Sequence, residues 1–396
     1  MKYVFLSFLM LCISSVNASI TVGKSGLLQS ELNGKNCRAY GVNYFDVFHR
    51  LLQDGKHQGY KIGFSELYSF GVPFVRFSAM NYWPKDFSLY FSDKEEYFRR
   101  LDLVFMEAEK NRIGLIPSLF FNKAMVPDLV GEPIESWSDP DSKTIQFMRQ
   151  YVKEFFTRYS KSKALWAIEF SNEVNLYTDL PNAKKFRPAV DVAKGTAVSR
   201  TEEDDLALID LQVALELFVK EVRTYDKNIP ISSGNGHPRR YAYHNMKYKS
   251  WTLDSGFQTE YMLKASNPNG INLVSVHIYP HHRVKLGHLS DSGTLSYEKI
   301  LNRVQKVAVE EGKVAFVGEF GVRAGEGRNG DEVEEFQLLM NAIYNSGVGL
   351  AALWVYRFDF QTNSFDVRQG SAREYQLREL LRFNNKLKDS GELCEF

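Results

Sequence analysis

The stretch Leu165-Trp-Ala-Ile-Glu-Phe-Ser-Asn-Glu173 is an apolar run that ends in a carboxylate, and Val314-Ala-Phe-Val-Gly-Glu-Phe-Gly321 repeats this pattern much later in the chain. Short apolar runs of this kind are typical of strands that are buried on both faces, as in a parallel sheet. A carboxylate at the C-terminal end of a barrel strand is poorly placed for stability, but it lies on the face where (β/α)8 barrels carry their active sites. We therefore predict that Glu173 and Glu319 face one another across a cleft.

The rest of the chain alternates between strand patterns and helix patterns. The predicted strands are Ala39–Phe45, Pro73–Phe77, Gly114–Phe121, Leu165–Phe170, Pro230–Ser233, Leu273–His277, Val314–Phe320 and Gly349–Val355. Helical periodicity lies between them, most clearly over Lys94–Arg112, Thr144–Tyr159, Glu202–Tyr225, Tyr297–Glu311, Glu332–Tyr344 and Glu374–Leu387. Eight strand–helix units predict an α/β fold with a closed (β/α)8 (TIM) barrel rather than an open sheet. No Pro/Ser linker divides the chain, so we predict a single domain.

The first residues are predicted to lie outside this domain. Met1-Lys2 is a positive start, Val4–Ile13 is apolar, and Val16-Asn17-Ala18 offers small residues for cleavage, which together indicate a secretory signal peptide over residues 1–18. The mature chain, residues 19–396, would then be the barrel domain and would be secreted or periplasmic. The apolar run is too short to span a bilayer, so no membrane anchor is expected.

Two features mark the ends of the mature chain. Ile20–Gly23 and Gly26–Ser30, around Asn33-Gly34, predict a small β-hairpin, because Asn-Gly suits a tight turn. Cys37 and Cys394 are the cysteines that remain after the signal peptide. An even pair in an oxidising compartment favours a disulfide between the hairpin and the C-terminal tail, and two separate thiols are the alternative.

Composition excludes one class of partner and leaves others open. The formal net charge is +1 and no basic stripe is present, so nucleic acid is not an expected partner. The aromatic content of 14% fits a protein that stacks rings on sugars, although a core of bulky side chains gives the same value. The sequence carries no signal for the oligomeric state.

Two carboxylates on one face of a barrel can cleave a glycosidic bond, because one can protonate the leaving oxygen while the other attacks or activates water. Either glutamate alone could instead bond a helix N-terminus or an arginine. Arg76 ends the second predicted strand, where it could keep a nucleophilic carboxylate ionised. The alternative for Arg76 is an ordinary structural salt bridge.

His277 and Tyr279 end the sixth predicted strand and fall on one side of it by alternation. The tyrosine hydroxyl could orient the nucleophile, and the imidazole could bond the acid/base or a sugar hydroxyl; the alternatives are a satisfied core histidine and a packing tyrosine. His281 and His282 follow and raise the question of a metal. Adjacent residues do not readily converge on one ion and no ligand spacing accompanies them, so we predict no metal site.

Further candidates surround the predicted cleft. Trp354, at the end of the eighth strand, could stack on a pyranose ring or simply fill the barrel top. Asn122 after strand three, and His237 with Asn235 after strand five, are weaker candidates. Glu169 lies deeper in strand four, where a buried charge must be paired, so we predict that it supports the site.

In this order, the residues resemble glycoside hydrolase family 5, the cellulase-like family of the retaining (β/α)8 clan. The similarity spans nearly the whole mature chain and is carried by Gly41-Val-Asn43, Arg76, Asn172-Glu173, His277-Ile-Tyr279, Gly318-Glu-Phe-Gly321 and Trp354. The resemblance implies that Glu173 is the acid/base and Glu319 the nucleophile. It further implies Asn172 on the sugar 2-hydroxyl, Arg76 and Tyr279 holding the nucleophile, His277 near the acid/base, and Trp354 beneath the sugar ring.

Within this family, Glu169-Phe-Ser-Asn-Glu173 and Val276-His-Ile-Tyr-Pro280 look most like the β-mannanase branch, which favours mannan slightly over glucan. Three segments depart from that pattern. Val174 stands where a proline commonly follows the glutamate, Phe120-Phe-Asn-Lys123 matches neither the cellulase nor the mannanase form, and Ser78-Ala-Met-Asn-Tyr-Trp83 has no clear counterpart.

The expected reaction is retaining cleavage of a β-linked, mainly β-1,4, polysaccharide or oligosaccharide without a cofactor. The two carboxyl groups should then stand about 5 Å apart, since a gap above roughly 6.5 Å indicates inversion. Burial should raise the pKa of Glu173, so that it can act as an acid. The long segments Val174–Arg200 and Tyr356–Gln369 should form cleft walls. A transglycosylase with the same residues and a non-catalytic carbohydrate-binding barrel are the alternatives.

Overall fold

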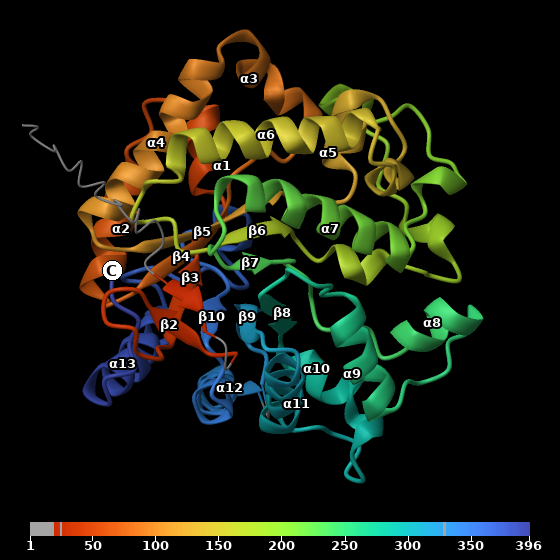
Figure 1. Cartoon of the computed structure of the whole chain (residues 1–396). Coiled ribbons are helices and arrows are strands. Elements are labelled where there is room, and N and C mark those ends of the chain that lie inside the picture. Colours follow the sequence, from red (N-terminus) through yellow and green to blue (C-terminus); the bar gives the residue numbers. More distant parts are fainter. Residues whose placement is uncertain (1–19, 24–25, 328–329) are drawn as a thin grey trace, which may run out of the picture.

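A closed barrel of eight parallel strands forms the centre of the molecule (Figure 1), in the order β10-β3-β4-β5-β6-β7-β8-β9. The computed structural model describes residues 20–23, 26–327 and 330–396, and the predicted signal peptide lies outside them. The barrel strands are β3 (Ala39–Asn43), β4 (Phe74–Ser78), β5 (Gly114–Phe120), β6 (Ile168–Ser171), β7 (Ile231–Ser232), β8 (Leu273–Ile278), β9 (Val314–Phe320) and β10 (Leu350–Leu353). The predicted (β/α)8 fold is confirmed.

Helices surround the barrel (Figure 1). Their bounds are α1 (Val47–Gln53), α2 (Gly59–Ser69), α3 (Ser88–Ser92), α4 (Lys94–Lys110), α5 (Met125–Val130), α6 (Lys143–Tyr159), α7 (Leu208–Tyr225), α8 (Ala242–Tyr248), α9 (Gly256–Ala265), α10 (Pro280–Lys285), α11 (Tyr297–Glu310), α12 (Glu332–Ser346) and α13 (Glu374–Asp389). None of the helices in these described residues is long and apolar enough to cross a membrane.

One predicted helix is shorter than expected. The pattern over Glu202–Tyr225 divides in two, with a single 3-10 turn at Glu202–Asp204 before α7. The Asp204 carboxylate accepts from the backbone of Thr201, and the Asp210 carboxylate accepts from the backbone of Ala207. These local bonds satisfy amide groups at two successive helix starts, so the chain breaks between them.

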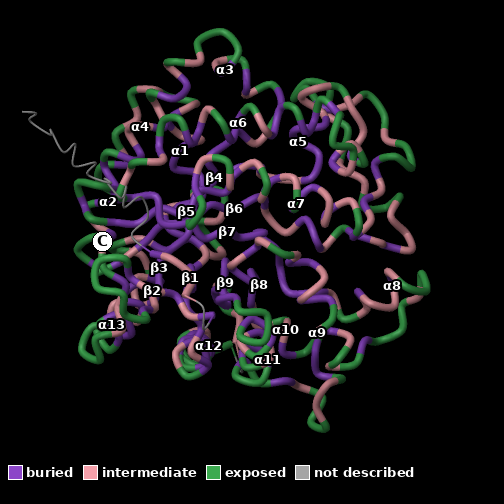
Figure 2. The backbone as a smooth tube through the Cα atoms, in the orientation of Figure 1, coloured by how far each residue is buried: buried purple, intermediate pink, exposed green. Residues whose placement is uncertain are grey.

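Burial explains why the strand patterns are almost uniformly apolar. Every residue of β4, β5, β8 and β9 is buried, as expected for strands with the barrel interior on one face and helices on the other (Figure 2). One large apolar cluster lies between the strands and the helices. A smaller cluster fills the end of the barrel interior where the strands begin, here called the lower end. Phe74, Trp166 and Phe316 meet there.

The chain ends close this lower end of the barrel. Strands β1 (Ile20–Val22) and β2 (Leu28–Ser30) form the predicted antiparallel hairpin, and its residues join the smaller apolar cluster. The Asn33-Gly34 turn, however, follows β2 and returns the chain so that Gln29 pairs with Asn36, which places this turn one segment later than predicted. Cys37 and Cys394 are joined by a disulfide across 357 residues of sequence.

Candidate active site

Arg76, at the end of β4, is the centre of the polar network inside the barrel mouth. Its side chain is fully buried. The guanidinium donates to Glu169 at 2.8 Å, to Asn43 Oδ1 at 2.8 Å, to Glu319 at 3.1 Å and to Asn172 Oδ1 at 2.7 Å. A planar group with five N–H donors can hold this many acceptors in a fixed geometry, which a lysine could not do.

The two deeper carboxylates are both paired, as burial demands. Glu169 is fully buried and accepts from Arg76 and from Ser232 Oγ at 2.9 Å. Glu319 is almost as buried, and it accepts from Arg76 on one oxygen and from the Tyr279 hydroxyl, at 2.6 Å, on the other. The sequence prediction for Glu169 as a supporting residue agrees with this arrangement.

Glu173 lies further out, with a side chain that is 33% exposed. It adopts a left-handed backbone conformation, with φ of 55°, and its amide donates to Gly234 O of the neighbouring β7 loop. A non-glycine residue rarely adopts this conformation, so the surrounding contacts must hold it there. Its carboxylate pairs with His277 Nδ1 at 2.9 Å, and the same nitrogen lies 3.4 Å from Glu319.

The carboxylates of Glu173 and Glu319 therefore face each other with His277 beside them, as predicted. Among the described residues, these three side chains form the one group close enough to share a metal ion, with candidate ligand atoms within 4.8 Å of one another. The Arg76 guanidinium, 3.1 Å from Glu319, would repel a cation at this point. His281 and His282 do not belong to the group.

The pKa shifts of the two glutamates differ from the prediction. Burial raises the pKa of Glu319, even though the charges of His277 and Arg76 act to lower it. Burial also acts to raise the pKa of Glu173, but the hydrogen bond and charge of His277, with the charge of Arg76, outweigh it and lower that pKa. The prediction of a raised Glu173 pKa is thus wrong, because the imidazole bonds directly to this carboxylate.

A bulge in β9 turns Glu319 into the barrel. Val317 pairs with Val276, whereas the next pair along these two strands joins Glu319 to His277, so Gly318 is an extra residue in β9. Without the bulge, alternation would place Glu319 on the outer face, opposite to Phe316. A side chain at Gly318 would collide with His277, since a Cβ there would lie 2.9 Å from its Nε2.

The remaining predicted residues occupy different parts of the mouth. Trp354 lines the cleft, packs on Phe45 and donates its indole N–H to Gln361 at 2.8 Å. His237 also lines the cleft; its Nδ1 lies 2.9 Å from Pro238 O, and burial lowers its pKa to about 4. The Asn122 side-chain oxygen accepts from the first amides of the segment leading into α5, so this oxygen has a structural role.

Two polar residues of the barrel mouth, Asn43 in the network and Lys123 outside it, had no assigned role in the sequence prediction. Asn43 accepts from Arg76 and donates to Gly318 O at 3.0 Å, so it ties the arginine to the bulged strand. Lys123 is buried, and its ammonium lies 4.6 Å from the centre of the Tyr177 ring. A buried polar residue at the end of a barrel strand was the available signal for both.

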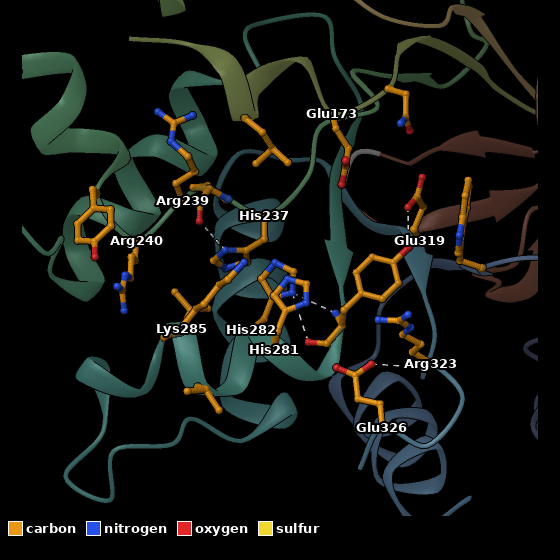
Figure 3. Close-up of a pocket in the computed structure, with 18 of the residues that line it drawn as sticks. Glu173, His237, Arg239, Arg240, His281, His282, Lys285, Glu319, Arg323 and Glu326 are labelled. Carbon is orange, nitrogen blue, oxygen red and sulfur yellow. Dashed lines mark hydrogen bonds between the residues drawn. The ribbon is translucent and has the colours of Figure 1, made fainter. Parts of the chain in front are cut away.

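The cleft has two lobes that meet at Asn172, Glu173 and Phe186. The larger lobe, shown in Figure 3, has a volume of about 950 Å³ and includes Glu319, Tyr279 and Trp354. The smaller lobe, of about 440 Å³, includes Lys123 and Asn122.

The long segment after β6 forms one wall of the smaller lobe, in line with the sequence expectation. Pro188, Ala189 and Arg200 from this segment line the lobe. Arg200 binds Asp128 of α5 through two 2.7 Å hydrogen bonds, which fix the wall against a neighbouring loop. The segment after β10 contributes Gln361 and Phe365 to the larger lobe.

Comparison with known proteins adds the family to this geometry. The family model described as cellulase (glycosyl hydrolase family 5) matches residues 131–357. No curated protein matches the chain in sequence. Among solved structures, an endo-1,4-β-mannanase from Rhizomucor miehei superposes with a TM-score of 0.67 at 13% identity, over 94% of this chain and 100% of that one.

Two further structures show the same fold. A glycoside hydrolase family 5 mannosidase from Rhizomucor miehei has a TM-score of 0.62 at 12% identity, over 94% of this chain and 99% of that one. A β-mannanase from the blue mussel Mytilus edulis has a TM-score of 0.57 at 13% identity, over 96% of this chain and 99% of that one.

Proposed function

The chain belongs to glycosyl hydrolase family 5 and is an O-glycosyl hydrolase, and we propose that it cleaves β-1,4-linked glycans with retention of configuration. The resemblance found in the sequence is confirmed at the level of the family. The observation that carries the finer proposal is the pair of facing carboxylates, Glu173 and Glu319, with oxygens within 4.8 Å of each other. Retaining enzymes need a short gap of about 5 Å, because the second carboxylate itself attacks the sugar.

In the first step, a Glu319 oxygen attacks the anomeric carbon while the bond from that carbon to the leaving oxygen breaks. The proton of the Glu173 carboxyl passes to the leaving oxygen, so Glu173 becomes a carboxylate and Glu319 becomes part of a glycosyl ester. In the second step, Glu173 removes a proton from water. The water oxygen attacks the anomeric carbon, and the ester bond breaks to restore the Glu319 carboxylate.

The surrounding residues fit distinct roles in this reaction. Arg76 and Tyr279 hold the two oxygens of Glu319, which aims the nucleophile and stabilises its charge. The side-chain oxygen of Asn172 accepts a hydrogen bond from Arg76, so its amide N–H groups are available to a sugar hydroxyl. Trp354 offers a ring face in the lobe that contains Glu319.

His277 links the two carboxylates and therefore controls where their shared proton resides. Its charge contributes to the lowered pKa of Glu173 and opposes the burial that raises the pKa of Glu319. The reactive state carries one proton on the pair, with Glu173 protonated and Glu319 ionised. A bound sugar would exclude water from the partly exposed Glu173, which favours its neutral form.

The substrate we propose is a polymer or long oligosaccharide, with mannan favoured slightly over glucan. Three observations support this choice: lobes on both sides of Glu173 give room for a chain that passes the catalytic pair, the Glu169–Glu173 segment has the mannanase-like sequence, and the similar folds include mannanases. Secretion is part of the proposal and is supported by the Cys37–Cys394 disulfide, since such bonds persist in oxidising compartments.

A substrate panel tests the reaction and its stereochemistry. Wild type, Glu319→Gln, Glu173→Gln and the exposed-helix control Glu216→Gln are compared on β-1,4-mannan, soluble cellulose derivatives, mixed-linkage glucan and xylan. Reducing ends measure hydrolysis, product sizes distinguish internal from terminal cleavage, and NMR of the first product gives the anomer. We expect a β-anomer first and loss of activity only in the two catalytic variants. An α-anomer would overturn retention, and longer products than the substrate would indicate transglycosylation.

A further inference from the structure

The larger lobe of the cleft carries a local excess of positive charge outside the catalytic pair. Its lining includes Arg239, Arg240, Lys285 and Arg323, against a single further carboxylate, Glu326. In Figure 3, the first three gather on the side of the pocket away from Glu319. The whole chain has a net charge of only +1, so this excess is a feature of the cleft and not of the protein surface in general.

Most of these cations have no carboxylate partner. Arg239 donates to the backbone oxygens of Asn175 and Thr178, which holds it in place. Among the described residues, Arg240, Lys285 and Arg323 form no side-chain salt bridge. Among the described residues, the Glu326 carboxylate accepts from the backbone amide of Arg323 and does not bind its guanidinium.

The smaller lobe contains a buried cation, Lys123, that also lacks a carboxylate partner among the described residues. Lys123 is 7% exposed, lines this lobe and has no carboxylate within ion-pair distance among the described residues. The carboxylates that act on it electrostatically, Asp204 and Asp205, are bound to Arg200 and Arg187 respectively. Lys123 therefore presents an ammonium group to the lobe with only the Tyr177 ring opposite it.

We propose that the cleft binds an acidic β-glycan, in which some sugars carry a carboxylate or sulfate group, and that Lys123, Arg240, Lys285 and Arg323 bind those groups. The inference rests on the proposed hydrolase function and specifies the chemical class of its substrate. The hydroxyl oxygens of a neutral glycan could accept hydrogen bonds from these cations. An anionic group would also balance their charge, and its charge-assisted hydrogen bonds are roughly twice as strong as neutral ones. Each such contact should raise kcat/KM by roughly tenfold.

The first experiment changes only the charge of the substrate. β-1,4-Mannan and β-1,4-glucan are oxidised at C6 to give graded fractions of uronate, and a second series carries C6 sulfate esters. We expect kcat/KM to rise with the degree of substitution up to a moderate level and to exceed that of the neutral polymer by tenfold or more. The advantage should shrink as salt rises from about 0.01 M to about 1 M, because the Debye length falls from about 30 Å to about 3 Å. The uronate and sulfate series distinguish the two anionic groups.

The second experiment assigns the effect to named residues. Lys123→Met preserves chain length and the apolar contact with Tyr177, and the triple variant Arg240→Gln, Lys285→Gln, Arg323→Gln removes the charges of the larger lobe. Both should lower the ratio of acidic to neutral kcat/KM towards one. Lys153→Gln, an exposed lysine on the outer face of α6, is the matched control and should leave this ratio unchanged.

Binding by Glu319→Ala separates this inference from the proposed hydrolase function. Affinity electrophoresis in gels that contain neutral or oxidised polymer measures retention without turnover. Stronger retention of Glu319→Ala by the oxidised polymer than by the neutral one would support the acidic ligand. If the wild type hydrolysed neither polymer, the hydrolase proposal would be overturned, and the retention result would still stand. Equal retention, with equal kcat/KM on neutral and acidic polymers, would overturn the acidic substrate class.

Discussion

The two ends of the barrel interior are built from the same strands but from opposite chemistry. On β4, Phe74 belongs to the apolar cluster at the lower end, and Arg76, two residues later on the same face, is the centre of the charged network at the mouth. The lower end is closed by the hairpin and the Cys37–Cys394 disulfide, whereas the mouth opens into a cleft. The same strands, β4 and β9, thus carry an apolar, covalently closed end and a polar, open end.

The charged mouth is costly to build, which makes its function recognisable. Fully buried Arg76 and Glu169 lose hydration that their mutual attraction only partly offsets. Well-packed apolar side chains of similar volume would often make a protein as stable as a buried ion pair does, or more stable. A buried arginine with two carboxylates at this position therefore fits the proposed role of Glu319 in the reaction.

Loss of the proposed nucleophile should produce the largest change in activity. It should also show most clearly that chemistry at the mouth can be lost without loss of stability. We expect Glu319→Gln to lower kcat by roughly 10³-fold or more, since the covalent path disappears. The thermal midpoint should change little, because the apolar lower end is untouched. Initial-rate kinetics and calorimetry on the same preparation measure both. If Glu319→Gln retained even a tenth of the wild-type kcat, Glu319 could not be the nucleophile.

Loss of Arg76 should affect both stability and activity, because this residue compensates two buried carboxylates at the mouth. Arg76→Met leaves Glu169 and Glu319 buried without their cation, which should lower the free energy of unfolding by about 3–5 kcal/mol and abolish activity. Urea unfolding followed by fluorescence and circular dichroism measures the stability. If Arg76→Met, Glu169→Leu proved as unstable as the single variant, the unpaired Glu169 charge would not be the cause.

Loss of the disulfide should affect the lower end alone. In Cys37→Ser, Cys394→Ser we expect the free energy of unfolding to fall by about 2–5 kcal/mol, because the bond closes a loop of 357 residues in the unfolded chain. At a temperature where the variant stays folded, kcat should equal that of wild type. A lowered kcat under these conditions would mean that the two ends are coupled. Reduction of the wild type with dithiothreitol should reproduce the stability loss.

The smallest expected effect is a shift of the pH profile at the mouth. The charge of His277 acts to lower the pKa of Glu173 and, against the effect of burial, that of Glu319, so His277→Gln should raise both values. Activity needs one proton on this pair, and both limbs of the bell-shaped profile of kcat/KM should therefore move to higher pH. His288→Gln, a change to an exposed histidine that does not line the cleft, is the control. An unmoved profile in His277→Gln would show that the imidazole does not influence the titration of the carboxylate pair.

The sequence alone determined the alternation of strands and helices and the position of both glutamates at strand ends. Periodicity is local, and strands buried on both faces are apolar over their whole length, so all eight barrel strands could be predicted. The segments around Glu173 and Glu319 also carried enough pattern to predict the family. The predicted break-free helix over Glu202–Tyr225 failed because side-chain caps at Asp204 and Asp210 outweighed the periodicity.

Only the tertiary structure decided how the site is aimed and charged. Alternation along β9 would have turned Glu319 outward, and the extra residue at Gly318 becomes visible only when β8 and β10 are paired with that strand. The lowered pKa of Glu173 depends on His277, which is 104 residues away in sequence. Whether a cation in the cleft is paired likewise depends on the carboxylates that distant loops place beside it. Contacts between distant segments set these properties, and no local pattern in the chain encodes them.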